Sequence, residues 1–197
     1  QYIGVSTTEL NAAFPRVSEC DVALVLGTRV DFRLGYGRPP VFSPDVVFVC
    51  VDVDPDEIQR TIVPEVGIVG DVALVLEQLL VEIRALGGMD ASAWLGELRE
   101  LRDASVTSWE TVEHDGNAPL PGYRICMALR EFLDQEVTFL LDGGNIGRWA
   151  YTLLANRHPS HWATCGISGV IGWGLPGGIV ANLVRPGKPV LLLSGDG

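Results

Sequence analysis

The last residues of the chain carry the side chains best suited to chemistry. A short apolar run, Val190 to Leu193, is followed by Ser194 and then by Gly195, Asp196 and Gly197. Such a run before glycine is typical of a strand in a parallel sheet, and the carboxyl ends of these strands form the usual ligand edge. Glycine lets backbone amides approach a phosphate, and a carboxylate can hold the divalent cation that neutralises it. The pattern predicts a diphosphate and metal site, with an ordinary tight turn as the alternative.

Two glycine-rich segments upstream support the first interpretation. Asp142-Gly143-Gly144-Asn145 follows a predicted strand over residues 136–141 and leads into a helix, whose free amides and dipole favour an anion. A strand-to-helix turn that needs glycine anyway is the alternative. Residues 166–178 are also dense in glycine, although each glycine weakens a helix by up to about 1 kcal/mol relative to alanine. Close approach of the backbone to a flat ligand explains them.

The first half of the chain has a comparable edge. Residues 21–26 and 46–54 read as buried strands. Gly27 and Arg29 follow the first strand, and Asp52 lies at the end of the second. Gly27 allows close backbone approach, Arg29 can grip a phosphate, and Asp52 can accept hydrogen bonds from ribose hydroxyls. An ordinary α/β layer with solvated Arg and Asp side chains stays open as the alternative, because no GxGxxG sequence is present.

Strands and helices alternate along the rest of the chain. We expect helices over residues 8–13, from 55, over 72–86, from 90 or 92 to 113, and over 123–133, with further strands at 68–71 and 161–165. Alternation of this kind indicates parallel sheets covered by helices. The predicted fold class is α/β, with two Rossmann-like three-layer units that are joined by a helical linker and are both incomplete.

Composition narrows the function classes. The formal net charge is −11 and the pI about 4.6, which disfavours nucleic acid and anionic membrane surfaces as partners. No apolar run approaches the roughly 20 residues of a spanning helix. The four cysteines are widely spaced without a CxxC pair, which argues against a zinc site and for free thiols in a reducing compartment, so we expect a cytoplasmic protein.

The order and spacing of these motifs resemble the thiamine diphosphate enzymes, in particular the acetolactate synthase large-subunit family. The segments LVLGTRVDFRLGYG, VDVDPDEI and VGDVALVLEQL are similar to that family's central domain, and DGGN, CGISGVIGWGLPG and SGDG to its diphosphate-binding half. The resemblance implies a central FAD- or ADP-binding domain over residues 1–86, a linker over 87–118 and the first part of a thiamine diphosphate domain over 119–197. The linker has its clearest boundary near residue 118.

The resemblance also implies roles for single residues. Gly27, Arg29, Asp52 and Asp71 would contact the dinucleotide. Gly144, Asn145 and Ile146 would contact the diphosphate, although the synthases proper carry Gln-His where Asn145-Ile146 stands, which bears on the substrate. The Gly169 carbonyl would accept a hydrogen bond from the aminopyrimidine, and Ile171 would prop the cofactor in a bent form, with an ordinary core residue as the alternative for Ile171. Asp196 would bind Mg²⁺ between Gly195 and Gly197.

The implied reaction decarboxylates a 2-keto acid and ligates the resulting enamine to a second carbonyl compound. No residue matches the glutamate that activates the aminopyrimidine in the family, so we expect a fragment without catalytic residues or activity of its own, in a homodimeric or homotetrameric enzyme. A 2-hydroxyacyl-CoA or oxalyl-CoA lyase and a benzoylformate-type decarboxylase are the alternatives within the superfamily. A non-catalytic nucleotide-binding module is the alternative from another class.

Overall fold

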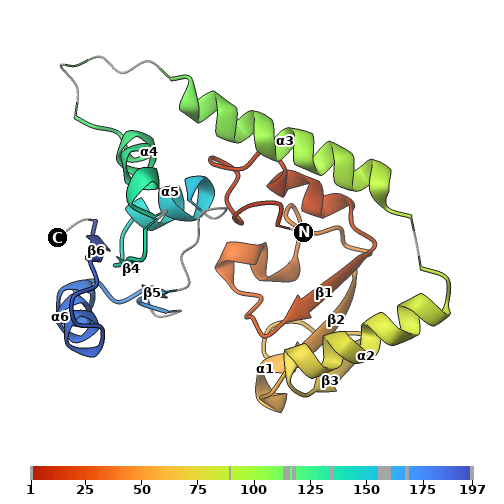
Figure 1. Ribbon diagram of the computed structural model, residues 1–197. Coiled ribbons are helices and arrows are strands. Elements are labelled where there is room, and N and C mark those ends of the chain that lie inside the picture. The colour runs from red at the N-terminus through yellow and green to blue at the C-terminus, as the bar shows by residue number, and fades with distance from the viewer. Residues whose placement is uncertain are drawn as a thin grey trace. The chain divides into compact units, whose positions relative to one another are not determined.

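The computed structural model describes residues 2–88, 90–112, 116, 119–133, 135–154, 161–166 and 169–195 (Figure 1). Its internal contacts form two units. One comprises Ser6–Thr8 and Ala12–Leu101, and the other comprises Gln1–Val5, Glu9–Asn11 and Arg102–Gly197. The long helix α3, Ser92–Glu110, passes from the first unit into the second.

The first unit is built on a three-stranded parallel sheet. β1 (Val22–Leu26), β2 (Val47–Asp52) and β3 (Val66–Val69) lie in the order β1-β2-β3. Apolar, β-branched side chains fill the central strand β2, as expected for a strand covered on both faces. α1 (Pro55–Ile58) and α2 (Val72–Ala85) follow β2 and β3 and pack on the sheet.

Aspartates set the starts of both helices in this unit. The Asp54 carboxylate accepts a hydrogen bond from Asp56 N, and Pro55 occupies the first turn of α1. Asp71 accepts hydrogen bonds from two backbone N–H groups at the start of α2. These caps satisfy amides that would otherwise lack a partner, and they confirm the predicted helix starts.

The predicted helix over residues 8–13 is wrong. These residues form turns, and a 3-10 helix (η1) occupies Phe14–Glu19 instead. The Asn11 side chain donates a hydrogen bond to the Val5 carbonyl at 2.8 Å, which competes with helical pairing of the backbone. Pro15 then begins the 3-10 helix, where its missing N–H is tolerated. A second 3-10 segment, η2, covers Phe32–Gly37.

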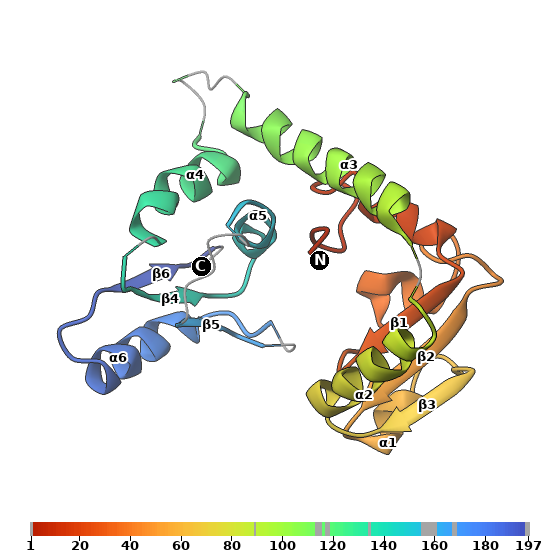
Figure 2. The same ribbon diagram turned by 45° about the vertical axis from the view of Figure 1, so that its right-hand side comes forward.

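The second unit has three layers. Its parallel sheet has the order β5-β4-β6, with β4 (Thr138–Leu141) between β5 (Trp162–Thr164) and β6 (Val190–Leu193). α4 (Gly122–Leu133) and α5 (Ile146–Leu153) lie on one face, and α6 (Gly174–Val184) lies on the other (Figures 1 and 2). Phe139 and Leu141 join the core under α4 and α5, whereas Leu140 faces α6.

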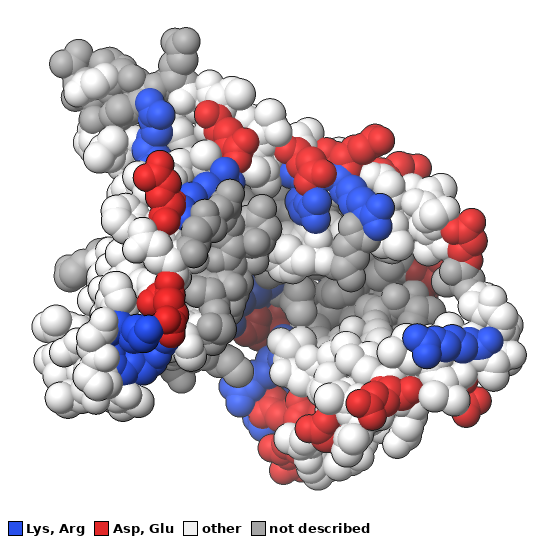
Figure 3. Space-filling model, in the orientation of Figure 1, with Lys and Arg blue, Asp and Glu red and all other residues white. Residues whose placement is uncertain are grey.

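The fold class predicted from the sequence is confirmed, because both sheets are parallel and each carries helices. None of the helices within the described ranges is long and apolar enough to cross a membrane. On the face shown in Figure 3, acidic and basic side chains lie beside one another, and the described residues there gather into no single basic patch.

Candidate functional site

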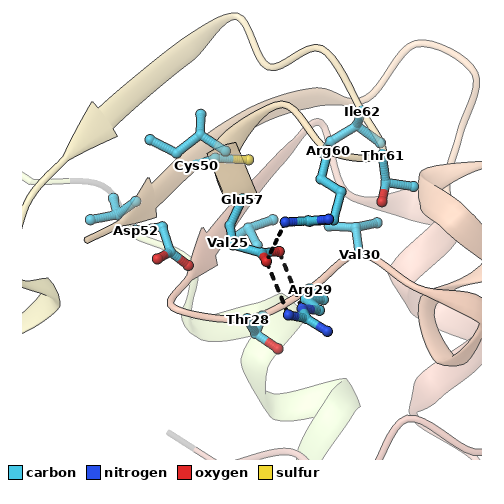
Figure 4. A pocket seen from close by; sticks show the side chains of 12 residues that line it. Val25, Thr28, Arg29, Val30, Cys50, Asp52, Glu57, Arg60, Thr61 and Ile62 are labelled. Carbon is cyan, nitrogen blue, oxygen red and sulfur yellow. Dashed lines mark hydrogen bonds and ion pairs between the residues drawn. The ribbon is translucent and has the colours of Figure 1, made fainter. Parts of the chain in front are cut away.

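A pocket lies at the carboxyl ends of β1 and β2 in the first unit (Figure 4). It is lined by Val25, Thr28, Arg29, Val30, Cys50, Val51, Asp52, Glu57, Ile58, Arg60, Thr61 and Ile62. Its lining combines apolar side chains with hydroxyl, guanidinium and carboxylate groups. This combination suits a ligand with both a flat apolar part and an anionic part.

Arg29 is held in this pocket by Glu57. Its Nε and Nη2 donate to the two oxygens of Glu57 at 3.2 and 3.0 Å, and Arg60 Nη2 pairs with the same carboxylate at 2.8 Å. Burial by itself raises the pKa of Glu57, but the hydrogen bonds from Arg60 and Arg29 outweigh burial and leave its pKa below the usual value. Two guanidiniums share one carboxylate, so the cluster retains a net positive charge.

The four predicted dinucleotide contacts fall into different places. Arg29 and Asp52 both line the pocket. Gly27 adjoins it in the left-handed conformation, with φ +54°, and its N–H donates to the Val51 carbonyl. Asp71 is engaged as the cap of α2. Sequence reasoning missed Glu57 as the anchor of Arg29, although its spacing of three residues from Arg60 in a helix start is a usable signal.

At the edge of the second sheet, three loops converge. Because β4, β5 and β6 are parallel, the loops that follow them leave from the same edge. A Cβ on Gly143, after β4, would lie 2.9 Å from Ile171 Cγ1 and 3.1 Å from the Gly169 carbonyl oxygen. A Cβ on Gly195, after β6, would lie 3.1 Å from Ile146 Cγ2. The backbone segments thus approach one another as closely as the absence of side chains allows.

These contacts bring predicted cofactor residues together. Gly144 adopts φ +103° beside Gly195, and Ile146 begins α5 over the same glycine. Ile171 is 56% exposed, so the alternative that it is an ordinary core residue is wrong for this unit. Asn145 is the N-cap residue of α5 but makes no side-chain cap hydrogen bond, and both Gly144 and Asn145 are exposed. The backbone at Gly144 and Asn145 is therefore open to an anion, although the N–H groups of Gly147 and Arg148 in the same turn already donate to the Gly144 and Asn145 carbonyls.

Asp142 is the functional residue to which sequence reasoning gave no role. It directly follows β4 and is only 5% exposed. Oδ1 accepts hydrogen bonds from Gly143 N at 2.8 Å and Gly172 N at 3.1 Å, and Oδ2 accepts one from Ser194 Oγ at 3.2 Å. Burial raises the pKa of this carboxyl, but these hydrogen bonds and one from Gly174 N outweigh burial, so its pKa lies below the usual value for an aspartate. An aspartate placed directly after a buried strand was the available signal.

The predicted metal ligand lies outside the described residues, as does Gly197. Asp196 and Gly197 follow Gly195 in the sequence. Within the described parts of the chain, no group of three His, Cys, Asp or Glu side chains is placed to hold a metal ion. The role of Asp196 stays a prediction.

Comparison with known families gives two matches. The model of the thiamine pyrophosphate enzyme central domain matches residues 1–79, which include the pocket with Arg29. The model of the thiamine pyrophosphate enzyme C-terminal TPP-binding domain matches residues 142–197, which begin at Asp142 and contain all three converging loops.

Individual relatives agree with these matches. The probable acetolactate synthase large subunit of Methanocaldococcus jannaschii is 29% identical over 192 residues, covering 94% of this chain and 32% of the relative. The acetolactate synthase large subunit IlvG of Mycobacterium tuberculosis is 30% identical over 201 residues, covering 98% and 35%. Human 2-hydroxyacyl-CoA lyase 1 is 28% identical over 182 residues, covering 89% and 32%. The chain spans about a third of the length of these relatives. It therefore belongs to the thiamine pyrophosphate enzyme family, and it is similar to acetolactate synthase large subunits over nearly its whole length.

Proposed function

We propose that this chain is part of a thiamine diphosphate- and magnesium-dependent enzyme like acetolactate synthase, which decarboxylates a 2-keto acid and joins the product to a second carbonyl compound. One observation carries the proposal. Gly143, Gly144, Ile146 and Gly195 meet at the carboxyl edge of the β5-β4-β6 sheet, inside the segment that matches the TPP-binding domain. The close approach of backbone without side chains there fits a diphosphate group.

Different residues at this edge bind different parts of the cofactor. The backbone amides of Gly144, Asn145 and Ile146 receive the diphosphate, and the dipole of α5 favours its charge. Asp196 holds the Mg²⁺, because carboxylate oxygen is a preferred ligand of this cation. When the cofactor is bound, the Gly169 carbonyl would accept a hydrogen bond from its aminopyrimidine, and Ile171 would support it. Bound thiamine diphosphate supplies the electron sink for decarboxylation.

The isolated chain is expected to be inactive. None of its residues is assigned as the carboxylate that activates the aminopyrimidine. Formation of acetolactate by the 197-residue polypeptide alone would contradict this expectation.

The test is a calorimetric titration of thiamine diphosphate and Mg²⁺ into the protein in its full reading frame. Wild type and the control Asp103→Ala, which changes an exposed aspartate of the same unit, should bind in the presence of Mg²⁺. Asp196→Ala should lose the Mg²⁺-dependent binding. Binding without Mg²⁺ in every protein would refute the metal role, and no binding at all would leave only a nucleotide-binding module.

A lyase acting on 2-hydroxyacyl-CoA is the second candidate. Asn145-Ile146 replaces the Gln-His pair of the synthases proper, and the human relative carries the name 2-hydroxyacyl-CoA lyase 1. The full-length protein should be incubated with a 2-keto acid and, separately, with a 2-hydroxyacyl-CoA. Carbon–carbon bond formation from keto acids supports the synthase, whereas acyl-CoA cleavage alone supports the lyase.

The pocket of the first unit is proposed to hold FAD or ADP. A guanidinium has five N–H donors, and Arg29 uses two of its nitrogens for Glu57, so donors remain for a phosphate. Arg29→Ala should weaken binding of the nucleotide at least about tenfold, which corresponds to 1.4 kcal/mol. Arg33→Ala is the matched control, because Arg33 lies in the same loop but pairs with Asp31 outside the pocket. Equal weakening by both variants would refute the assignment.

Assembly, location and domain limits stay predictions. A homodimer or homotetramer finds support in the exposed apolar side chains of α6, among them Leu175, Ile179 and Leu183, since exposed apolar surface favours association. Analytical ultracentrifugation of the full-length protein tests this. The cytoplasmic location rests on composition, and the domain limits at residues 86 and 118 rest on the motif pattern; limited proteolysis that cleaves outside 87–118 would contradict the latter.

A further inference from the structure

Asp142 is a buried carboxylate that takes no part in the proposed binding of diphosphate and metal. It stands at the end of the central strand β4, and its two oxygens reach all three converging loops. Gly143 belongs to the loop after β4, Gly172 to the loop after β5, and Ser194 to the loop after β6. A single side chain therefore ties together the segments that form the edge.

The carboxylate also takes the place of a helix cap. Trp173, the N-cap residue of α6, makes no side-chain cap hydrogen bond. The backbone N–H groups of Gly172 and Gly174, at the start of that helix, donate hydrogen bonds to the Asp142 carboxylate instead. A negative charge at this position is favoured by the dipole of α6. The amino end of α6 thus faces a carboxylate of the chain itself, while the N-cap residue of α5, Asn145, makes no side-chain cap hydrogen bond.

The loop after β5 is consequently clamped from two sides. Gly172 is bound to Asp142, and the preceding residues press on Gly143, where a Cβ would meet Ile171 Cγ1 at 2.9 Å and the Gly169 carbonyl oxygen at 3.1 Å. Gly174 leaves equally little room, since its Cβ would lie 3.0 Å from Asp142 Cβ. Moving Asp142 would therefore move Ile171 and the Gly169 carbonyl relative to the start of α5.

We propose that Asp142 is a positioning residue, which through Gly172 sets the place of Ile171 and of the Gly169 carbonyl relative to the diphosphate seat at the start of α5. This inference rests on the proposed function. In the proposed function these two sites would hold different parts of the cofactor, so their separation would decide how it is held. Displacement of a positioned group by about 1 Å can lower a rate about 100-fold.

The test replaces the carboxylate by an amide of the same shape in the full-length protein. In Asp142→Asn the amide oxygen can still accept from Gly172, while the amide NH₂ faces Ser194 Oγ, which can accept. The charge is lost, and the second acceptor with it. Asp103→Asn is the matched control at an exposed carboxylate of the same unit.

Two measurements are made on each protein. The first is amide deuterium exchange of the peptide around Gly172 without cofactor, which should be about two- to tenfold faster in Asp142→Asn, the factor for one weakened hydrogen bond. The second is deuterium exchange at the thiazolium carbon C2 of bound thiamine diphosphate, which should fall about 10- to 100-fold. The dissociation constant of the cofactor should change much less than the exchange at C2.

The outcomes separate this role from the proposed function. If wild type does not bind the cofactor, the proposed function fails and this role fails with it. If wild type binds and Asp142→Asn exchanges C2 at the same rate, only the positioning role is overturned. Losses of affinity and of C2 exchange by the same factor would indicate general loosening and also overturn it.

Should Asp142→Asn fail to fold, Gly143→Ala supplies the second variant. The added Cβ of residue 143 would contact Ile171 and the Gly169 carbonyl too closely and displace them, while the Asp142 carboxylate is unchanged. Slower exchange at C2 is expected here too, and an unchanged rate would overturn the proposal.

Discussion

Two glycines in α6 offer a matched test of the packing at the cofactor edge. Gly174 and Gly178 stand one helical turn apart. A Cβ on Gly174 would lie 2.5 Å from Leu192 Cδ1 and 3.0 Å from Asp142 Cβ, whereas a Cβ on Gly178 would have its nearest neighbour at 3.6 Å, in ordinary contact. We predict that Gly174→Ala destabilises the chain and that Gly178→Ala does not.

The magnitude follows from two opposing contributions. Alanine is more favourable than glycine inside a helix by up to about 1 kcal/mol, which Gly178→Ala can gain, whereas Gly174 is the first residue of α6 and its replacement gains less. Only Gly174→Ala overfills a packed site, which costs about 1–3 kcal/mol. The Leu192 side chain can turn away, but Asp142 cannot follow because its carboxylate is held by three loops. The two variants should therefore differ in free energy of unfolding by about 1–3 kcal/mol.

The assay is guanidinium denaturation followed by tryptophan fluorescence. Every tryptophan except Trp94 lies in the second unit, so the signal reports mainly on the sheet that α6 covers. In a chain of this size, each kcal/mol also shifts the melting temperature by about 2–4 °C. Equal stability of the two variants, or a less stable Gly178→Ala, would refute the reasoning that α6 is pressed against Asp142.

Three further predictions concern single groups. Asp71→Ala should lower the free energy of unfolding by about 1 kcal/mol through loss of the α2 cap, while Asp71→Asn, which keeps a cap, should lower it less. Chemical denaturation followed by far-UV circular dichroism measures both variants, and equal losses of stability would contradict capping. An aromatic disulfide reagent should modify Cys20 and Cys165 in the folded chain but not Cys126. Burial excludes the reagent from Cys126 and raises the pKa of its thiol to about 12. Rapid labelling of Cys126, detected by mass spectrometry, would contradict this. The pKa of Asp142 is lowered in the folded state, so the ionised carboxylate stabilises the fold at pH values above its unfolded-state pKa, and this stabilisation is lost as the pH falls through its folded-state pKa. The difference in free energy of unfolding between wild type and Asp142→Asn, measured by urea denaturation, should therefore shrink below about pH 4. A difference that stays constant with pH would contradict this.

Local pattern was enough to predict most of the secondary structure. Short, largely apolar runs such as Val47–Asp52 and Val190–Leu193 are typical of strands in a parallel sheet. Asp54 and Asp71 mark helix starts because each side chain accepts hydrogen bonds from backbone N–H groups two or three residues further along the chain. The one clear failure, the helix expected over residues 8–13, occurred where a side chain, Asn11, bonds to backbone outside any regular element.

The parallel α/β architecture and the strand-end loops in which the candidate sites lie could be predicted from residue order, because these depend on side chains close together in the chain. The contacts that those side chains make depend on the folded structure. Glu57 holds Arg29 from 28 residues away, and Asp142 binds Gly172 and Ser194 at separations of 30 and 52 residues. Ile171, surrounded by glycines in the sequence, proved exposed and not part of a core. Hydrogen bonds and burial depend on distances in space, which no local pattern records.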